Sequence, residues 1–113
     1  MECASPISHE PVIKKKLNSA FIGTSLQALL TDLNARKLIF AGLTTDHCVS
    51  TTVRMAANFG FTATVVTDAT ATFPRRDYEG HLIEADAVHR IALASLEGEF
   101  ACITQTEKLL TMP

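Results

Sequence analysis

The sequence of 113 residues lacks the features typical of membrane, nucleic-acid-binding and secreted proteins. Its formal net charge is -2, and its one basic cluster is the lysine run at residues 14–16, so no basic patch for nucleic acid or anionic lipid is expected. No apolar stretch approaches the roughly 20 residues that a membrane-spanning helix needs. Residues 1–10 have no signal-peptide character. We therefore expect a cytoplasmic protein without nucleic-acid or membrane partners.

Cysteine and histidine are also scarce and widely spaced. The three cysteines are an odd number without a C-x-x-C spacing, which argues against a disulfide framework or a cysteine-rich zinc site. The four histidines include no close ligand pair. We therefore expect neither a metal nor another cofactor. The residues concerned are Cys3, Cys48, Cys102, His9, His47, His81 and His89.

The composition and length indicate one globular domain. Hydrophobic residues make up 47% of the chain and charged residues 19%, which is sufficient for a core. Strand-like and helix-like segments alternate, and this order predicts an α/β fold with a parallel sheet between helix layers. Residues 1–10 are expected to be an irregular lead-in. The expected strands are 11–13, 38–43, 62–67 and 100–103. The expected helices are 25–34, 47–59 and 81–96, and a short final helix is expected to begin at a capping box formed by Thr104 and Glu107. Residues 68–80 are the expected loop.

Cys48 lies where a buried strand gives way to a helix. Ligands bind at the carboxyl ends of parallel strands, and a helix N-terminus stabilises a thiolate. Asp68, after the next strand, is expected at the same edge of the sheet. A small buried hydrophobe is the alternative interpretation of Cys48. The same interpretation, a small buried hydrophobe, is favoured for Cys102, which lies inside a predicted strand. Cys3 is interpreted as an incidental thiol.

Two neighbours of Cys48 are candidates for contact with a substrate. Asp46 could enter a pocket or cap the helix, and capping is the favoured interpretation. His47 could act as a base, but adjacent residues on a helix do not face each other, so a solvated or capping histidine is favoured.

The lysine run offers one partner for the thiol. Side chains alternate along an extended segment, so Lys15 points opposite Lys14 and Lys16. An ammonium near a thiol lowers its pKa and can stabilise an oxyanion. The alternative is a solvated charge run.

Several ordered motifs resemble the isochorismatase-like cysteine hydrolase family. Residues 10–26 read EPVIKKKLNSAFIGTSL, and residues 41–56 read AGLTTDHCVSTTVRMA. DATATF at 68–73 and LASLEGEFA at 93–101 follow with suitable spacing. The resemblance covers nearly the whole chain from about residue 10.

The resemblance implies a three-layer α/β/α fold and a Cys-Lys-Asp triad. Cys48 matches the family nucleophile and Lys15 its lysine. The N–H groups of Thr44 and Cys48 would form the oxyanion hole, the peptide before Thr44 would be cis, and Phe21 would line the pocket. The family cleaves C–N bonds of small amides or carbamoyl compounds through a thioester, and its members are usually oligomers, so a homo-oligomer is expected. The vinyl-ether-cleaving branch lacks this cysteine, which favours amide chemistry.

One part of the family pattern is absent. The family aspartate follows a first strand as Asp-x-Gln, yet residues 1–10 contain no Asp, and their acids are Glu2 and Glu10. The metal cluster of nicotinamidase members would lie in the same absent part. Residues 11–113 thus resemble the C-terminal two-thirds of the domain, in an N-terminally truncated member with strand 38–43 left as an open edge. Three interpretations remain: a hydrolase, a catalytically inactive paralogue that serves as a binding or assembly subunit, and an incomplete sequence.

Overall fold

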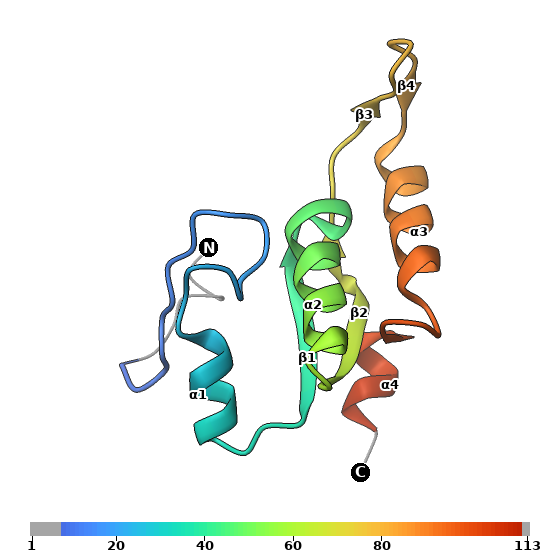
Figure 1. Ribbon diagram of the computed structural model, residues 1–113. Helices are drawn as coiled ribbons and strands as arrows, with labels where there is room; N and C mark the ends of the chain where they lie inside the picture. The colour runs from blue at the N-terminus through green and yellow to red at the C-terminus, as the bar shows by residue number, and fades with distance from the viewer. Residues whose placement is uncertain (1–7, 112–113) are drawn as a thin grey trace.

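A three-stranded parallel sheet forms the centre of the protein. The computed structural model describes residues 8–111. Its strands β1 (Lys37–Leu43), β2 (Thr62–Ala71) and β5 (Cys102–Thr104) lie in the order β1-β2-β5, so β2 is central (Figure 1). The β-branched sequence TATVVTDATA suits this central position. The predicted α/β fold with a parallel sheet is confirmed.

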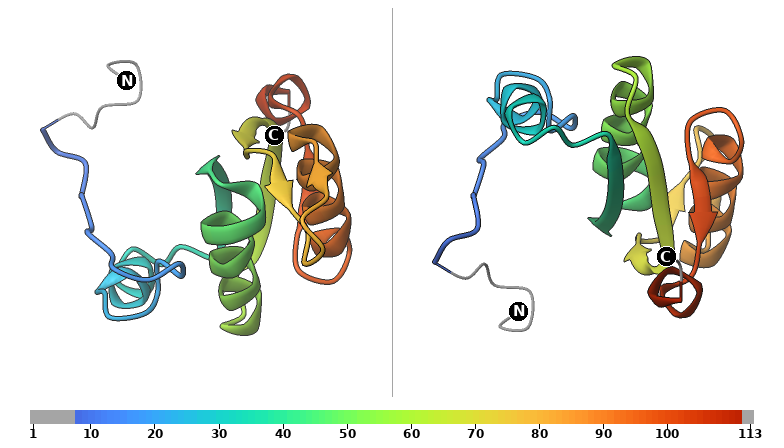
Figure 2. Two further views of the ribbon diagram at one scale, coloured as in Figure 1. Left: turned by 90° about the horizontal axis from the view of Figure 1, so that it is seen from above. Right: turned by 90° about the horizontal axis from the view of Figure 1, so that it is seen from below.

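Helices cover both faces of this sheet. Helices α2 (Ser50–Asn58) and α3 (Ala85–Leu96) pack on one face, and α4 (Thr106–Leu110) lies on the other (Figure 2). The core lies between the α2/α3 layer and the sheet, and its buried apolar side chains come from both helices, from β2 and from the residues directly before α2 and β5. Its buried members are Val49, Val53, Ala63, Val65, Leu93, Leu96 and Ala101. No helix in the described part of the chain is long and apolar enough to cross a bilayer.

The amino-terminal part packs less closely. Helix α1 (Leu26–Asp32) has no buried residue and lies beyond the β1 edge of the sheet (Figures 1 and 2). Within the described residues, β1 pairs only with β2, and Ile39 and Leu43 are 60% and 61% exposed. The predicted open edge at strand 38–43 is confirmed. Residues 11–13, predicted as a strand, have no regular structure, because no neighbouring strand pairs with them.

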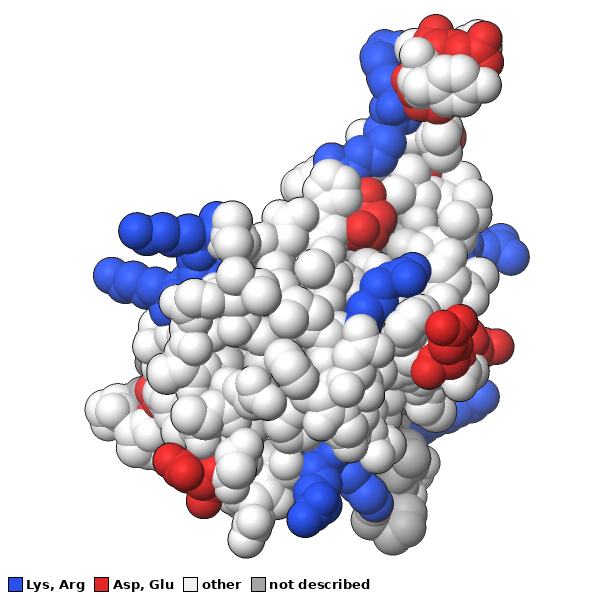
Figure 3. Space-filling view, viewed as in Figure 1, with Lys and Arg blue, Asp and Glu red and all other residues white. Residues whose placement is uncertain are grey.

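A small antiparallel hairpin replaces part of the predicted loop and helix. Strands β3 (Arg75–Arg76) and β4 (Leu82–Ile83) pair and project from the domain (Figure 1). Helix α3 therefore begins at Ala85, four residues later than predicted. The face shown in Figure 3 is largely uncharged over α2, whereas both signs of charge gather at the hairpin tip.

Ile91 and Cys102 are both exposed. Ile91 lies about 200° around α3 from Leu93, which faces the core, so it points to solvent. Cys102 is exposed because neighbouring residues of a strand point to opposite faces. Ala101 and Ile103 face the core, and Cys102 faces away from it. The prediction that Cys102 is buried is wrong.

Candidate active site

The turn that carries Cys48 directly follows β1. We call residues 44–49 the Cys48 turn. The peptide between Leu43 and Thr44 is cis, as the family resemblance implied. A π-helical turn, η2 (Thr45–Val49), follows and leads into α2. This order places Cys48, which is half-buried, at the carboxyl end of β1.

Lys15 reaches Cys48 from a distant part of the chain. Its Nζ lies 3.2 Å from Cys48 Sγ and donates to the Leu17 carbonyl at 2.8 Å. The Cys48 thiol also lies 3.8 Å from Asn18 Oδ1. A lysine and a cysteine separated by 33 positions are thus brought to hydrogen-bond distance.

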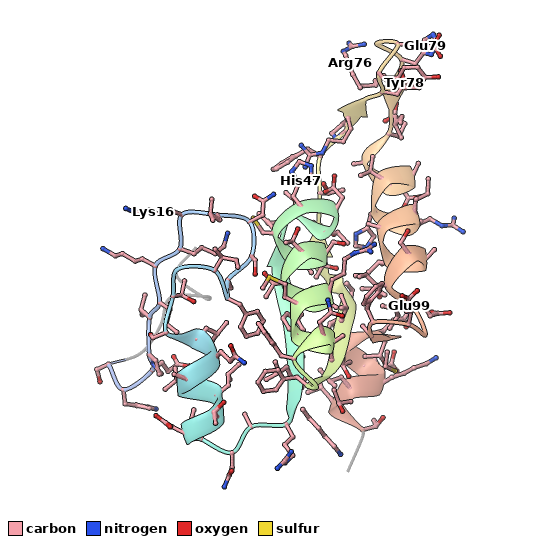
Figure 4. All side chains as sticks on the ribbon, in the orientation of Figure 1. Lys16, His47, Arg76, Tyr78, Glu79 and Glu99 are labelled. Atoms are coloured by element: carbon pink, nitrogen blue, oxygen red, sulfur yellow. The ribbon has the colours of Figure 1, made fainter. Side chains whose placement is uncertain are left out.

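The two flanking lysines do not share this contact. Lys14 and Lys16 line a separate hollow with Leu17, Ile22 and Gly23. Figure 4 shows Lys16 on the outside of its loop, pointing away from α2. The predicted difference between Lys15 and its neighbours is confirmed, although the segment is irregular rather than a strand.

Side chains of α2 hold the loop that carries Lys15. We call residues 14–22 the lysine segment. The Ala20 N–H donates to Thr52 Oγ1 at 3.0 Å, and Ser19 Oγ donates to Met55 Sδ at 2.7 Å. Sequence reasoning missed these anchors. One signal could have indicated Thr52, because it lies one helical turn after Cys48 on the same face.

A cavity of about 230 Å³ opens beside the Lys15–Cys48 pair. Its polar groups come from Lys15, Cys48 and Thr52, and its remaining lining is apolar. No carboxylate is among the described residues that line it. The open edge of β1 forms one wall. The lining residues are Lys15, Ala20, Leu26, Phe40, Ala41, Leu43, Cys48, Val49 and Thr52.

Phe21 lies next to this cavity but belongs to an aromatic cluster. Its buried ring packs edge-on against Phe59 at a centroid distance of 5.2 Å and stacks with Phe61 at 6.2 Å. Ala20, rather than Phe21, is among the lining residues. A direct contact of Phe21 with a substrate stays a prediction.

Asp46 joins the Cys48 turn to the base of the hairpin. Its carboxylate accepts hydrogen bonds from Arg75 Nε at 3.0 Å and Thr72 Oγ1 at 2.6 Å. Burial alone would raise the pKa of Asp46, but the hydrogen bonds from Arg75 and Thr72 outweigh it and lower the pKa to about 2. Arg75 Nη2 also lies 3.4 Å from Thr44 Oγ1.

These contacts correct the favoured role of Asp46. The side chain makes no capping hydrogen bond, since Arg75 and Thr72 engage it instead. With Arg75 it lines a second hollow, between α2 and α3, and it is not among the residues around Cys48. A role in substrate binding stays a prediction.

His47 is exposed at the outer end of the turn (Figure 4). Its Nε2 lies 3.6 Å from Asp46 Oδ2, and it does not line the Cys48 cavity. The favoured interpretation of a solvated histidine is confirmed. Its proposed contact with a substrate stays a prediction.

Asp68 lies near the carboxyl ends of β2 and β5, as expected, and has a structural role there. It accepts hydrogen bonds from the N–H of Thr106 at 2.9 Å and from its hydroxyl at 2.8 Å, at the start of α4. These two hydrogen bonds lower the pKa of Asp68. The predicted capping box of Thr104 and Glu107 is wrong, because Asp68 satisfies the first turn of α4 in its place.

A buried clamp on the Cys48 turn was also missed. Thr45, fully buried, lies 2.7 Å through its hydroxyl from His89 Nδ1, and His89 Nε2 lies 3.1 Å from the Thr67 carbonyl. The sequence offered no signal, since 44 positions separate Thr45 and His89.

Comparison with known proteins agrees with this geometry. A model of the isochorismatase domain matches residues 1–108. The chain belongs to the isochorismatase family. The uncharacterized isochorismatase family protein YrdC of Bacillus subtilis is 43% identical over 109 residues, which are 96% of this chain and 58% of that protein.

Two further relatives have names that state an activity. The solved structure of a cysteine hydrolase from Pseudomonas syringae pv. phaseolicola superposes with a TM-score of 0.92 at 26% identity, over 97% of this chain and 52% of that one. Nicotinamidase 3 of Arabidopsis thaliana is 32% identical over 88% of this chain and 45% of that protein. The chain spans between 45% and 58% of the length of these three relatives.

Proposed function

We propose that this chain carries the nucleophile and the lysine of a cysteine hydrolase that cleaves a C–N bond in a small amide or carbamoyl compound. The observation that carries this proposal is the 3.2 Å approach of Lys15 Nζ to Cys48 Sγ at the carboxyl end of β1. An ammonium at that distance places a positive charge beside the sulfur that would attack a carbonyl carbon. The names of the cysteine hydrolase and nicotinamidase relatives support the reaction class.

The proposed reaction has two covalent stages. Cys48 Sγ attacks the carbonyl carbon of the substrate, and the carbonyl oxygen becomes an oxyanion. The C–N bond then breaks, the leaving nitrogen takes up a proton, and a thioester remains on Cys48. Water adds to the thioester, the C–S bond breaks, and the acid leaves with the thiol restored.

Two groups of this chain are proposed to stabilise the oxyanion. Thr44 and Cys48 lie in one short turn directly after β1, which supports a role for their N–H groups. The Lys15 ammonium adds a positive charge beside the same cavity. The small, mostly apolar cavity suits a compact substrate rather than a peptide.

Proton transfer to the leaving nitrogen needs a group beyond the described cavity lining. Lys15 and Thr52 are the polar neighbours of Cys48 there, and neither is a carboxylate. A general acid typically contributes about 10²–10⁴-fold to the rate. We therefore expect thioester formation to be slow in this chain by itself, and faster when a carboxylate is supplied beside the open edge of β1.

Alternatively, the chain is a catalytically inactive paralogue that acts as a binding or assembly subunit. The exposed Ile39 and Leu43 on the unpaired edge of β1 favour this function, because such an edge can pair with another strand. Size-exclusion chromatography with light scattering tests it, since assembly predicts a stable oligomer. A monomer at all concentrations contradicts the assembly function.

Competitive labelling with iodoacetamide tests the hydrolase proposal. Cys102 is exposed and Cys48 is half-buried, so access alone predicts faster labelling of Cys102. An activated thiol predicts the reverse order, with Cys48 faster than both Cys102 and Cys3. Peptide mass spectrometry of the native chain measures each rate. Equal or slower labelling of Cys48 contradicts the proposal.

Two lysine variants provide a matched comparison. Lys15→Met removes the ammonium at Sγ and is expected to slow labelling of Cys48 about tenfold. Lys14→Met removes the same charge one position away and is expected to leave the rate near that of the wild type. A similar fall of the Cys48 labelling rate in both variants would mean that the rate depends on the overall charge of the segment rather than on the Lys15 contact.

A further inference from the structure

The buried clamp between Thr45 and His89 joins three elements at the Cys48 turn. Thr45 lies in η2, His89 in the first half of α3, and Thr67 in β2. The imidazole ring lies between the Thr45 hydroxyl and the Thr67 carbonyl, at 2.7 and 3.1 Å. No residue around the cavity of Cys48 belongs to this clamp.

The partners of the ring determine which nitrogen carries the proton. The Thr67 carbonyl can only accept, so His89 Nε2 carries a hydrogen and donates it. In the neutral ring Nδ1 then has a free lone pair and accepts from the Thr45 hydroxyl. Thr45 is fully buried, and a buried hydroxyl without a partner is unfavourable, so this acceptor fixes the position of the side chain.

An irregularity in β2 presents the Thr67 carbonyl to this ring. Pairing with β1 passes from Phe40↔Val65 to Gly42↔Thr70, so residues 66–69 of β2 are not paired with β1. Pairing with β5 ends at Val66. Thr67 therefore lies inside the gap in the β1 pairing and directly after the pairing with β5.

The clamp acts on the same short turn as the nucleophile. Cys48 follows Thr45 by three residues in a single π-helical turn. Asp46, one of the two residues between them, is held by Arg75 of the hairpin. The clamp therefore fixes the buried side of the turn, while Asp46 fixes its outer side.

We propose that His89 is a positioning residue that acts through Thr45 to hold Cys48 Sγ at its distance from Lys15 Nζ. Because this role concerns the reactivity of Cys48, it rests on the proposed function. Loss of the Nδ1 acceptor or of the Thr45 hydroxyl frees the turn to rotate. The thiol then leaves the ammonium and reacts like an ordinary cysteine.

Matched substitutions at both ends of the contact test this role. Thr45→Val removes the hydroxyl at nearly constant volume, and Thr45→Ser keeps it. His89→Leu removes both ring nitrogens, and His89→Asn keeps an acceptor near the position of Nδ1. Labelling of Cys48 relative to the exposed Cys102 is measured with iodoacetamide on the native full chain.

The expected pattern separates positioning from mere folding. The Cys48-to-Cys102 ratio falls about tenfold in Thr45→Val and His89→Leu, because small displacements of reacting groups carry penalties of this size or more. Thr45→Ser and His89→Asn restore it to near the wild-type ratio. The double variant, with Thr45→Val and His89→Leu together, has a labelling ratio no lower than that of either single variant, since both changes remove the same contact.

A control on the same helix addresses stability. Leu93→Val trims the core one turn after His89 and leaves the clamp intact, so it is expected to lower stability without changing the ratio. If His89→Leu does not fold, His89→Gln takes its place, because its longer side chain reaches toward Thr67 and leaves Thr45 without the Nδ1 acceptor.

The outcomes distinguish this role from the proposed function. If wild-type Cys48 is labelled no faster than Cys102, the proposed function fails and the positioning role fails with it. If wild-type Cys48 is faster and Thr45→Val and His89→Leu or its substitute keep that advantage, only the positioning role is overturned. A loss that Leu93→Val shares equally also overturns it, because the effect then follows stability alone.

Discussion

The Cys48 turn and the lysine segment meet at one pair of atoms but are built differently. The turn follows a paired strand, is fixed by Arg75 on one side and His89 on the other, and continues into the core through Val49. The lysine segment has no helix or strand. It is held by contacts with α2, such as those of Thr52 and Met55.

This difference indicates which half of the candidate site keeps its position without the other. The position of the thiol follows from the sheet and the core, whereas the position of the ammonium depends on an irregular segment held by polar contacts with α2 and by the packing of one ring, that of Phe21. Segments with few buried apolar contacts open locally at low free energy. We therefore expect the thiol side to be robust and the lysine side to be sensitive to small changes.

The largest expected effect contrasts the core with α1. Leu96→Ala removes a fully buried side chain and is expected to lower the free energy of unfolding by about 2–5 kcal/mol. Leu33→Ala, at the end of α1 where the side chain is 65% exposed, is expected to change it by less than about 0.5 kcal/mol. Urea unfolding measures both. Equal losses would contradict the description of α1 as loosely attached.

Acid unfolding tests the outer anchor of the turn. The pKa of Asp46 is lowered from 3.8 to about 2, so the carboxylate stabilises the fold above about pH 4, and this stabilisation is lost as the pH falls through 2. Since the side chain is 17% exposed, the contribution is about 2 kcal/mol.

A comparison with Asp46→Asn isolates this contribution from that of other acids. The stability difference between the wild type and the variant is expected to shrink between pH 4 and pH 2. Urea unfolding at several pH values measures it. A difference that stays constant over this range would exclude the ion pair with Arg75 as an anchor.

A smaller effect concerns the attachment of the lysine segment. Thr52→Ala removes the acceptor of the Ala20 N–H and is expected to cost about 1 kcal/mol locally. Hydrogen exchange of Ala20 should accelerate while amides of α2 stay protected. Thr51→Ala, on the adjacent position of α2, is the matched control. Acceleration in both variants would show that α2 itself, rather than this hydrogen bond, had loosened.

The smallest effect concerns the start of α4. Asp68→Ala removes the acceptor of the Thr106 N–H and hydroxyl, so the first turn of α4 is expected to exchange faster. The labelling rate of Cys48 should not change. A change in that rate would show that Asp68, which lies at the same edge of the sheet, also acts on the candidate site.

Local sequence signals predicted the sheet and half of the site. The apolar run before Cys48 and the β-branched run at 62–67 predicted β1 and most of β2, and alternation set Lys15 apart from Lys14 and Lys16. The family resemblance, rather than any local pattern, supplied the cis peptide before Thr44.

The wrong and missed sequence predictions share a physical cause, because each of these residues takes its role from partners distant in the sequence. Asp46 was read as a cap because its partner Arg75 lies 29 positions away, and Cys102 was read as buried because the strand pattern alone does not say which face is covered. The clamp between Thr45 and His89 depends on a bulge in β2 that no sequence pattern marked.

The most direct test of the central claim is the proximity of Lys15 and Cys48 in solution. Phthalaldehyde condenses with an amine and a thiol that lie side by side and forms a fluorescent isoindole that joins them. The account predicts one dominant isoindole, which peptide mapping assigns to Lys15 and Cys48 and which is lost in Lys15→Met but retained in Lys14→Met. An isoindole on Cys102 alone, or equal yields in the two lysine variants, would contradict it.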